Sequence, residues 1–386
     1  MKREEARRGN GNAVWKYRNP VQIVFGAGSF DELRNLLNGR SYAVATYPEP
    51  FFASLIGKLS KQAGAPLLVI DDVAPNPDTV LLAAQTLRFR ALPVLPEVVV
   101  AIGGGSVIDS AKVFAAARGD FGAVDRFLRT KVGGETLAPI PLIAVPTTAG
   151  TGSEVTSWGT VWDTQGGKKF SLAHPDLYPS YAVVDPALML AKPKALTIST
   201  GLDALSHALE SLWNVNANPV SANHAVAAAR EVIEVLPPLV NDLGNLELRT
   251  RMAKAAMFAG LAFSNTATAI AHSMSYPITL AHNVPHGIAC SFSLPFVLRS
   301  VIGCGGLCED ALRRIFGPDL EKGARELEAL ITSLGVSTSP QSYGITPAEW
   351  LALVGEAFGG DRGRNFLGSK EKLLAASVDR KERSFA

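Results

Sequence analysis

The spacing of hydrophobic positions changes part-way along the chain. Up to about residue 190, short apolar runs alternate with stretches of helical spacing, which is typical of βαβ units and a mostly parallel sheet. These runs are continuous rather than alternating, as in strands that are covered on both faces. They predict strands at 41–46, 66–70, 97–102, 141–147 and 181–185.

Beyond about residue 195 the strand pattern disappears and long segments rich in Ala and Leu follow. The stretch 185–200 carries two prolines and a Thr/Ser helix start, and we interpret it as a linker. A chain of 386 residues can form two domains. The sequence therefore predicts an α/β domain over residues 1–192 and an all-α domain over residues 193–386. The predicted long helices are 199–213, 220–236 and 248–270.

Composition argues against several classes of partner. The net charge is only +2, so no field draws the chain toward nucleic acid or a membrane surface. No apolar run follows the charged opening twelve residues, which we expect to be solvated, and no apolar stretch of about 18 residues could span a bilayer. An odd number of cysteines, three, suits reduced thiols. We therefore expect a cytoplasmic protein without nucleic-acid or membrane partners.

A glycine turn follows the predicted strand 97–102. Gly103, Gly104, Gly105 and Ser106 lead into a helical segment, and glycine backbone at a helix start can cradle phosphate. A tight βα turn is the alternative reading, because the run is not a GxGxxG fingerprint. The loop 146–154 follows the next strand and lies at the same sheet edge, where ligands bind in open α/β sheets. This edge is a candidate dinucleotide site.

The residues after the first predicted strand bear on the choice of cofactor. An acidic side chain at this point binds ribose hydroxyls and repels a 2′-phosphate, but Tyr47 occupies the first position and Glu49 follows. Both NADH and NADPH are therefore consistent with the sequence.

Four residues predict a metal site. Asp203 and His207 lie one turn apart on one face of a predicted helix, and His272 and His286 flank a segment that two prolines make turn-rich. One carboxylate with three imidazoles suits Fe(II), Zn(II) or another divalent ion, and leaves a position open for a substrate oxygen. Any one of these histidines alone would more often be a hydrogen-bonded core or surface group. The combination of four residues supports the metal hypothesis.

These segments, in this order, resemble the iron-containing (group III) alcohol dehydrogenase family. The resemblance covers nearly the whole chain, through GGGSVIDSAK, PTTAGTGSEVT, STGLDALSHALE and the spacing from His272 to His286. Within the family, AHSMSYPITLAHNVPHGIACSFSLP is similar to the phosphonoacetaldehyde reductase branch. The resemblance implies an α/β dinucleotide-binding domain, a helical metal-binding domain of the dehydroquinate synthase-like fold, and a homodimer or higher homo-oligomer.

Site residues carry over from the resemblance by position. It implies the metal ligands Asp203, His207, His272 and His286 for Fe2+, with Zn2+ or another divalent ion as alternatives. It implies cofactor contacts at Tyr47, Gly103, Gly104, Gly105, Ser106, Asp109, Thr147, Thr148, Thr151 and Lys169. Candidate residues for an anionic substrate group are Asn265, Arg362 and Arg364.

Two residues are candidates for moving a proton. Where many family members have a histidine four residues after the third ligand, this chain has Tyr276. A phenol with a pKa of about 10 relays protons poorly at neutral pH but can donate a hydrogen bond, and a packing role is equally consistent. His282, ten residues after His272, could join a relay or orient a ligand.

The resulting hypothesis is a metal-dependent NAD(P)H oxidoreductase that reduces a small aldehyde to a primary alcohol. The branch resemblance points to phosphonoacetaldehyde, reduced to 2-hydroxyethylphosphonate in phosphonate biosynthesis. Sulfoacetaldehyde or general short-chain aldehydes are alternative substrates. A dehydroquinate synthase-like lyase is the alternative from another reaction class, and a non-catalytic cofactor-binding protein is a third.

Overall fold

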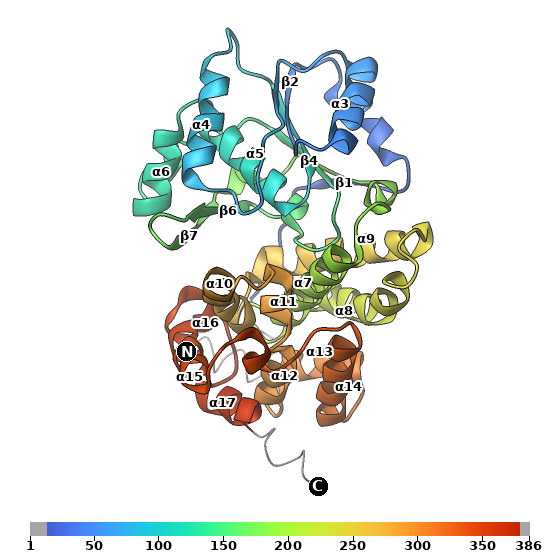
Figure 1. Cartoon of the computed structure of the whole chain (residues 1–386), viewed down its shortest axis with the longest axis vertical. Helices are drawn as coiled ribbons and strands as arrows, with labels where there is room; N and C mark the ends of the chain where they lie inside the picture. Colours follow the sequence, from blue (N-terminus) through green and yellow to red (C-terminus); the bar gives the residue numbers. More distant parts are fainter. Residues whose placement is uncertain (1–13, 379–386) are drawn as a thin grey trace. The chain divides into compact units, whose positions relative to one another are not determined.

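The computed structural model describes residues 14–378 (Figure 1). The expected solvated tail at the N-terminus lies outside this range. The described residues divide into an α/β unit, Asn19–Ala191, and a helical unit that holds residues 192–378 and 14–18. Residues 14–18 were expected in the first domain. They belong to the helical unit because the Tyr17 hydroxyl donates to Leu261 O and Arg18 N to Asn265 Oδ1.

A parallel sheet of six strands forms the centre of the α/β unit, in the order β1-β8-β5-β4-β2-β3. All five predicted strands are present. The sequence missed β1, because its residues lie at the sheet edge and are half-buried or exposed, without a continuous buried run. The strands are β1 (Gln22–Phe25), β2 (Tyr42–Ala45), β3 (Leu68–Ile70), β4 (Val98–Gly103), β5 (Leu142–Pro146) and β8 (Tyr181–Val184).

Helices cover both faces of this sheet, so alternate residues of each strand enter different cores. In β4, Val98, Val100 and Ile102 join one core, and Val99 and Ala101 join the other. Burying one such valine side chain contributes about 1.5–3 kcal/mol, which explains the continuous apolar runs in the sequence. The helices of this unit are α2 (Leu33–Leu37), α3 (Pro50–Ala63), α4 (Thr79–Arg90), α5 (Gly105–Ala117) and α6 (Phe121–Thr130).

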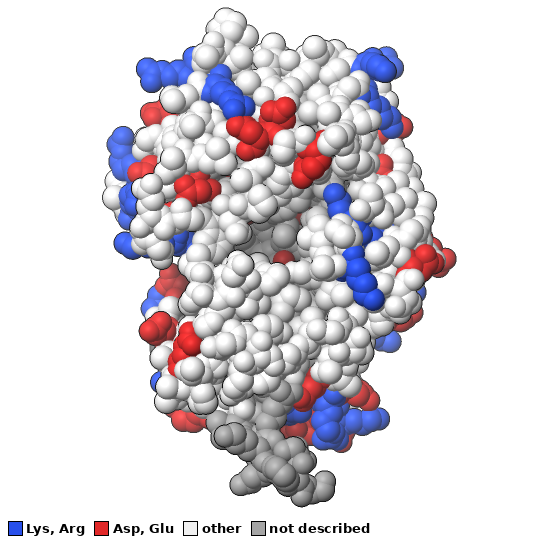
Figure 2. Space-filling view, viewed as in Figure 1, with Lys and Arg blue, Asp and Glu red and all other residues white. Residues whose placement is uncertain are grey.

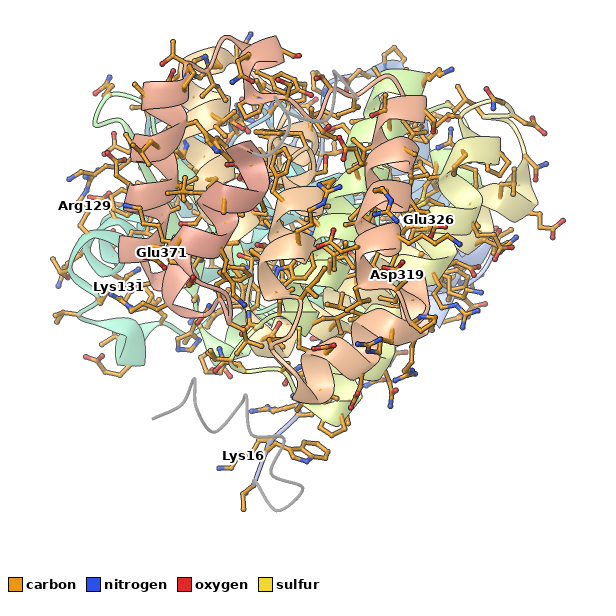
Figure 3. The ribbon with its side chains drawn as sticks, turned by 90° about the horizontal axis from the view of Figure 1, so that it is seen from below. Lys16, Arg129, Lys131, Asp319, Glu326 and Glu371 are labelled. Atoms are coloured by element: carbon orange, nitrogen blue, oxygen red, sulfur yellow. The ribbon has the colours of Figure 1, made fainter. Side chains whose placement is uncertain are left out.

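A two-stranded antiparallel hairpin accompanies the main sheet and was not predicted. It pairs β6 (Trp158–Asp163) with β7 (Lys168–Ala173). Asp163 accepts a hydrogen bond from Gly166 N across the turn of the hairpin. It also forms an ion pair with Arg129 of α6, which is labelled in Figure 3, and this ion pair ties the hairpin to α6.

The helical unit is built on three long helices that pack against one another, α7 (Lys194–Leu212), α8 (Pro219–Leu239) and α9 (Leu246–Thr266). They confirm the predicted helices, but α7 starts at Lys194, so the second half of the expected linker is helical. Polar caps fix helix starts, as where Asp319 accepts from Lys322 N at α14 (Figure 3). The remaining helices are α10 (Ile270–His282), α11 (His286–Ser291), α12 (Leu294–Val301), α13 (Gly306–Phe316), α14 (Leu320–Ser333), α15 (Pro347–Gly359), α16 (Asp361–Arg364) and α17 (Lys370–Val378).

Short 3-10 turns connect several of these elements: η1 (Ser29–Glu32), η2 (Gly134–Thr136), η3 (Ser153–Val155), η4 (Pro175–Leu177), η5 (Pro186–Met189) and η6 (Pro340–Tyr343). No helix in residues 14–378 is long and apolar enough to cross a membrane. On the face drawn in Figure 2, acidic and basic side chains are interspersed.

A buried lysine fastens the loop after β5 to α5. The Lys112 ammonium donates to Ser153 O and Trp158 O, each at 2.7 Å, and to Thr156 Oγ1 at 3.1 Å. Burial lowers the pKa of Lys112 to about 8 and raises the pKa of Glu154, in the same loop, to about 7. The loop that carries the predicted cofactor threonines is therefore fixed through one cation.

Replacing Lys112 by Met is expected to destabilise the protein by about 3–5 kcal/mol, because buried carbonyl oxygens lose a charged donor. Urea unfolding followed by circular dichroism measures the change. Lys61→Met on α3, where the side chain is exposed, is the matched control and should change the stability by less than about 0.5 kcal/mol. Equal stability of the two variants would contradict the anchoring role.

Candidate metal centre and cofactor site

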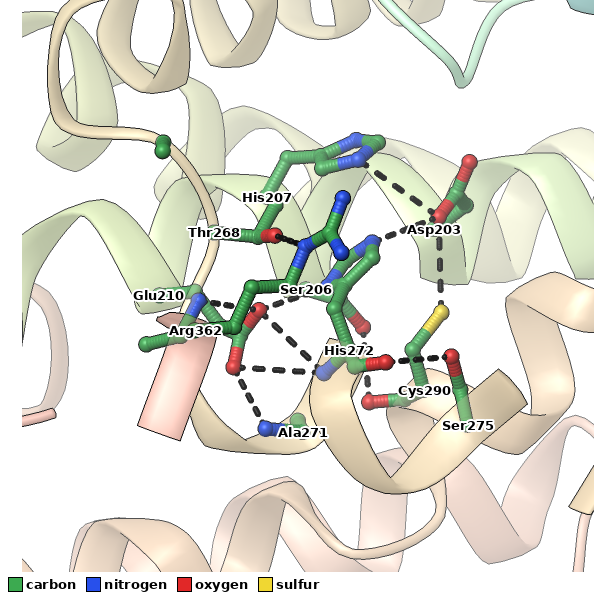
Figure 4. A network of polar contacts seen from close by, with 12 residues as sticks. Asp203, Ser206, His207, Glu210, Thr268, Ala271, His272, Ser275, Cys290 and Arg362 are labelled. Carbon is green, nitrogen blue, oxygen red and sulfur yellow. Dashed lines mark hydrogen bonds and ion pairs between the residues drawn. The ribbon is translucent and has the colours of Figure 1, made fainter. Parts of the chain in front are cut away.

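Three helices bring four potential metal ligands together at one point. Asp203 comes from α7, His272 from α10, and His286 and Cys290 from α11; their ligand atoms all lie within 4.8 Å of one another. Asp203 Oδ1 is 3.5 Å from His272 Nε2 and 3.4 Å from Cys290 Sγ (Figure 4). Ligands of one tetrahedral ion at bond lengths of about 2.0–2.3 Å are roughly 3.3–3.8 Å apart. The separations of Asp203 from His272 and from Cys290 suit a shared ion.

A glycine allows α11 to lie directly against α7. A Cβ atom at Gly287 would lie 1.9 Å from the carbonyl oxygen of Ser199, so no other residue fits there without moving a helix. Ser206 Oγ of α7 also donates to Cys290 O at 3.1 Å. These two contacts hold His286 and Cys290 over the face of α7 that carries Asp203.

The fully buried carboxylate of Glu210 orients His272. It accepts from His272 Nδ1 at 2.6 Å and from Ala271 N at 2.5 Å and Ala269 N at 3.1 Å. The other ring nitrogen of His272, Nε2, is also buried, and within residues 14–378 it has no hydrogen-bond partner. A buried imidazole nitrogen that makes no hydrogen bond and lies 3.5 Å from a carboxylate oxygen fits a metal ligand. Glu210 was missed, although its spacing of seven residues from Asp203 places both on one helix face.

Charge in the cluster is strongly coupled. Burial alone would raise the pKa of the Asp203 carboxyl, but the surrounding histidines hold it well below its usual range. Burial alone would lower the pKa of His272, but negative charge on Cys290 and then on Glu210, and the contact with Asp203, raise it well above its usual value. The metal-free cluster therefore holds a proton that a metal ion must displace.

The fourth expected ligand, His207, lies beside this compact group rather than in it. Its Nε2 is 3.8 Å from Asp203 Oδ1. Its ring stacks on Phe263, with a centroid distance of 4.1 Å, and on His272, at 4.6 Å. The 3.8 Å separation from Asp203 is within the range for two ligands of one ion, so His207 stays a predicted ligand, and Cys290 is an additional thiol in the group.

A ring stack connects the group to an arginine. The half-buried ring of Tyr276 stacks on His286 with centroids 5.6 Å apart, and the guanidinium of Arg362 lies 4.8 Å from the centroid of Tyr276. Arg362 Nε donates to Thr268 Oγ1 at 2.8 Å, which fixes the side chain. Among residues 14–378, no acidic side chain lies within 4.0 Å of the Arg362 guanidinium, so Arg362 forms no ion pair with them. A cation near the predicted metal group thus has no partner of opposite charge among these residues.

α10 continues through Pro277, so His272 and His282 both lie on one helix and the segment is not turn-rich as expected. His282 Nε2 pairs with Glu349 Oε1 of α15 at 2.6 Å. It lies outside the compact ligand group, and the pairing with Glu349 argues for a link between helices rather than a proton relay.

The structure also argues against two expected substrate contacts. The Asn265 amide bonds to the backbone of Arg18 with both its oxygen and its nitrogen, so its polar atoms are already used. Arg364 is 65% exposed and pairs with Asp361 at the surface. Of the three candidates, Arg362 alone lies against the ring that stacks on His286.

The expected cofactor residues of the α/β unit gather where the sheet reverses its winding. β3 lies on one side of β2 and β4 on the other, and ligands bind at the carboxyl ends of such strands. Tyr47 follows β2 there and the glycine turn follows β4. A Cβ atom at Gly104 would lie 3.2 Å from Thr148 Oγ1 and 3.8 Å from the Tyr47 hydroxyl, and one at Gly105 only 2.7 Å from the Thr151 side chain. Glycine keeps this backbone open, as phosphate binding requires.

The side chains of the other expected cofactor residues make contacts within the protein. The half-buried Asp109 carboxylate accepts hydrogen bonds from Ser153 Oγ at 2.5 Å and Thr160 N at 2.8 Å, which argues for a structural role rather than a contact with pyrophosphate. Thr147 is buried at the end of β5. Lys169 lies on β7 with its Nζ 5.3 Å from the Trp162 ring centroid. Ser106 Oγ accepts from Asn76 N at 3.3 Å.

The model of the iron-containing alcohol dehydrogenases matches residues 20–186, and the model of the C-terminal part of the Fe-containing alcohol dehydrogenase family matches residues 197–367. The chain belongs to the iron-containing alcohol dehydrogenase family. This confirms the expected family, fold and oxidoreductase class.

Several members of the iron-containing alcohol dehydrogenase family are similar along much of the chain. The phosphonoacetaldehyde reductase of Streptomyces viridochromogenes is 33% identical over 292 residues, which cover 70% of this chain and 72% of that enzyme. An NAD-dependent methanol dehydrogenase of Bacillus methanolicus is 33% identical over 246 residues, which cover 63% of this chain and 62% of that enzyme, less than two thirds of its length. The crystal structure of sulfoacetaldehyde reductase from Bifidobacterium kashiwanohense in complex with NAD+ has a TM-score of 0.86 and 30% identity, and the match covers 95% of this chain and 99% of that chain.

Glu210→Gln is expected to weaken Zn2+ binding by about 10- to 100-fold, because the amide presents an N–H group to backbone donors and no longer orients His272 as a carboxylate does. Competition with a chromophoric chelator measures the affinity. The control is Glu326→Gln on the exposed face of α14, labelled in Figure 3, which should bind zinc as the wild type does. An unchanged affinity in Glu210→Gln would contradict the orienting role.

Metal binding is expected to weaken in acid and to continue strengthening above neutral pH. The raised pKa of His272 means that its proton competes with the metal through the neutral range. One displaced proton gives a change of about tenfold in apparent affinity per pH unit. Zinc titrations between about pH 6 and about pH 8 test this, and a flat profile would show that no proton is displaced.

Proposed function

We propose that this chain is a metal-dependent NAD(P)H aldehyde reductase that converts phosphonoacetaldehyde to 2-hydroxyethylphosphonate. The observation that carries the substrate assignment is the position of Arg362, a half-buried guanidinium against Tyr276, whose ring stacks on His286 of the ligand group. A planar guanidinium matches two oxygens of a phosphonate in a forked geometry. The similarity to a phosphonoacetaldehyde reductase supports the same assignment.

Each group has a distinct task in this proposal. A divalent ion held by the ligand group would supply Lewis-acid polarisation of the aldehyde, and the nicotinamide would supply the hydride. Arg362 binds the phosphonate and so orients the carbonyl group at the other end of the substrate. The Tyr276 hydroxyl donates a hydrogen bond at the oxygen that gains negative charge, and the final proton comes from water.

The cofactor in this proposal is NADH or NADPH, bound at the glycine turn. A neutral Tyr47 follows β2 in place of an acidic residue, which leaves 2′-phosphate unopposed at that position. The NAD+ complex of the similar sulfoacetaldehyde reductase supports NADH. We prefer iron as the metal on the ground of the family, with zinc as the alternative.

Sulfoacetaldehyde is the second candidate substrate. A sulfonate also offers three oxygens to a guanidinium but carries a single negative charge. One of the similar structures is named a sulfoacetaldehyde reductase, which supports this alternative. A reductase oxidises one NADH for each substrate molecule consumed, whereas the alternative lyase regenerates its cofactor in each turnover. Measuring net NADH oxidation against substrate consumption would therefore separate either reductase from the lyase.

We extend the proposal to a cytoplasmic homo-oligomer that acts in phosphonate biosynthesis. The three cysteines are free thiols, which supports a reducing compartment. A homodimer or larger assembly stays a prediction from the family resemblance, and sedimentation of the purified protein would test it.

Arg362→Ala is expected to lower kcat/KM for phosphonoacetaldehyde by about a hundredfold, equivalent to roughly 2.7 kcal/mol, while propanal changes by less than about threefold. The loss should appear mainly in KM, because the arginine binds a group that does not react. Steady-state NADH oxidation by the metal-loaded enzyme measures both substrates. Arg364→Ala, on the same short helix but at the surface, is the matched control.

Two outcomes would overturn the substrate assignment. The wild type could reduce propanal as efficiently as phosphonoacetaldehyde, or Arg362→Ala and Arg364→Ala could behave alike on the anionic substrate. A preference for sulfoacetaldehyde would keep the anion-binding role of Arg362 and replace the substrate.

A further inference from the structure

The guanidinium of Arg362 is held along one of its edges. Its Nε donates to Thr268 Oγ1 at 2.8 Å (Figure 4), and within residues 14–378 the two terminal nitrogens, Nη1 and Nη2, form no hydrogen bond. We propose that Thr268 is a positioning residue that orients Arg362, so that the edge formed by Nη1 and Nη2 receives the anionic group of the substrate. The inference rests on the anion-binding role of Arg362 in the proposed function, and it gives the substrate preference a second determinant.

The first support is the shape of the guanidinium. Its five N–H donors lie in one plane, and two of its edges can each bind two oxygens of an anion: the edge of Nε with a terminal nitrogen, and the edge of Nη1 with Nη2. The contact with Thr268 occupies the first of these edges. One face of the plane also lies against the Tyr276 ring, with the guanidinium carbon 4.8 Å from the ring centroid. A phosphonate therefore has one edge left for a forked contact.

The second support is that the backbone around Thr268 is fixed. Each carbonyl of the segment 266–268, between α9 and α10, accepts a hydrogen bond from the side-chain amide of a different asparagine. The pairs are Asn216 with Thr266 O at 3.2 Å, Asn214 with Ala267 O at 3.1 Å, and Asn365 with Thr268 O at 3.1 Å. Asn365 also donates its backbone N–H to Arg362 O at 3.0 Å, so one turn of chain bonds Thr268 through two residues. A fixed Thr268 can hold a guanidinium in one orientation.

The conformation of Ala267 shows that this segment is constrained. Its φ of 58° and ψ of 178° lie in a region that favours glycine, and other residues stay there only where surrounding contacts hold them. Ala267 N donates to Phe263 O at 2.8 Å, and Ala269 N donates to the Glu210 carboxylate at 3.1 Å. The segment that presents Thr268 to Arg362 therefore continues directly into the contact that orients the metal-ligand candidate His272. Strained backbone of this kind is concentrated at binding sites.

The third support is the use of the Thr268 hydroxyl. Thr268 is buried, and in the described part of the chain its Oγ1 forms its hydrogen bond with Arg362 alone. The neighbouring Thr266 instead donates its hydroxyl to Ala267 O at 2.9 Å, a local backbone contact that is common for threonine. The contact of Thr268 joins side chains 94 residues apart and so serves the arrangement around Arg362.

The test is the substrate preference of Thr268→Val, which keeps the shape of the side chain and removes the acceptor for Nε. The ratio of kcat/KM for phosphonoacetaldehyde to that for propanal should fall by at least about tenfold, mainly through KM for the anionic substrate. Thr268→Ser, which keeps the hydroxyl, should restore the ratio to within about threefold of the wild type. The matched control is Thr332→Val on the exposed side of α14, which should keep the wild-type ratio. An unchanged ratio in Thr268→Val, or no rescue by serine, would overturn the proposal.

A double-mutant cycle separates positioning from a general structural effect. Because Thr268 acts through Arg362, adding Thr268→Val to Arg362→Ala should lower kcat/KM for phosphonoacetaldehyde by less than about twofold further. A further loss of about tenfold would show that Thr268 acts independently and would overturn the proposal. If Thr268→Val fails to fold, Thr268→Ala also lacks the acceptor and provides the same comparison.

Nuclear magnetic resonance of the arginine Nε–H groups tests the contact without any substrate. The signal of Arg362, identified by its absence from Arg362→Lys, should shift in Thr268→Val and remain in place in Thr268→Ser. A preference for phosphonoacetaldehyde with neither the signal nor the substrate ratio changed in Thr268→Val refutes only the positioning role. A shifted signal in a protein that reduces propanal as efficiently as phosphonoacetaldehyde refutes only the substrate.

Discussion

The hydrogen bond between Glu210 and His272 is the interaction on which the candidate metal centre depends. A buried carboxylate that accepts from Nδ1 and from two backbone N–H groups at the start of α10 fixes the helix start, the ring and the tautomer together. The remaining nitrogen is then directed at Asp203. Without a cation nearby, this arrangement would bury two carboxylates on either side of one imidazole ring at high cost, which a histidine proton or a metal ion relieves.

Much of the fold could be read from hydrophobic spacing because the central strands and long helices each bury continuous surface. The pattern failed where burial is partial. β1 is an edge strand, β7 has only one buried residue, and β6 mixes Gly, Thr and Asp with its apolar residues, so none of the three gives a continuous apolar run. The start of α7 was missed because Pro193 and Pro186 suggest a loop, although proline is compatible with the residues that precede a helix.

Only those parts of the candidate site that depend on residue type and local spacing could be predicted from the sequence. Asp203, His272 and His286 carry their chemistry in the side chain and were identified directly. Cys290 was treated as an ordinary thiol, because its proximity to Asp203 depends on how closely α11 approaches α7 at Gly287. Asn265 was a candidate by chemistry, but its amide is used by the Arg18 backbone, a contact between distant segments that no local pattern encodes.

The tyrosine that departs from the family pattern accounts for how an arginine can lie near a cationic centre. An imidazole at position 276 would carry a proton part of the time and repel the guanidinium of Arg362, whereas a phenol is neutral and its ring face attracts a cation. A divalent ion and a guanidinium still repel each other across the short stack of Tyr276 on His286. Both are stabilised together when an anion lies between them. The proposed substrate, a small aldehyde that carries its negative charge close to the carbonyl group, would meet this requirement, and a neutral alcohol would not.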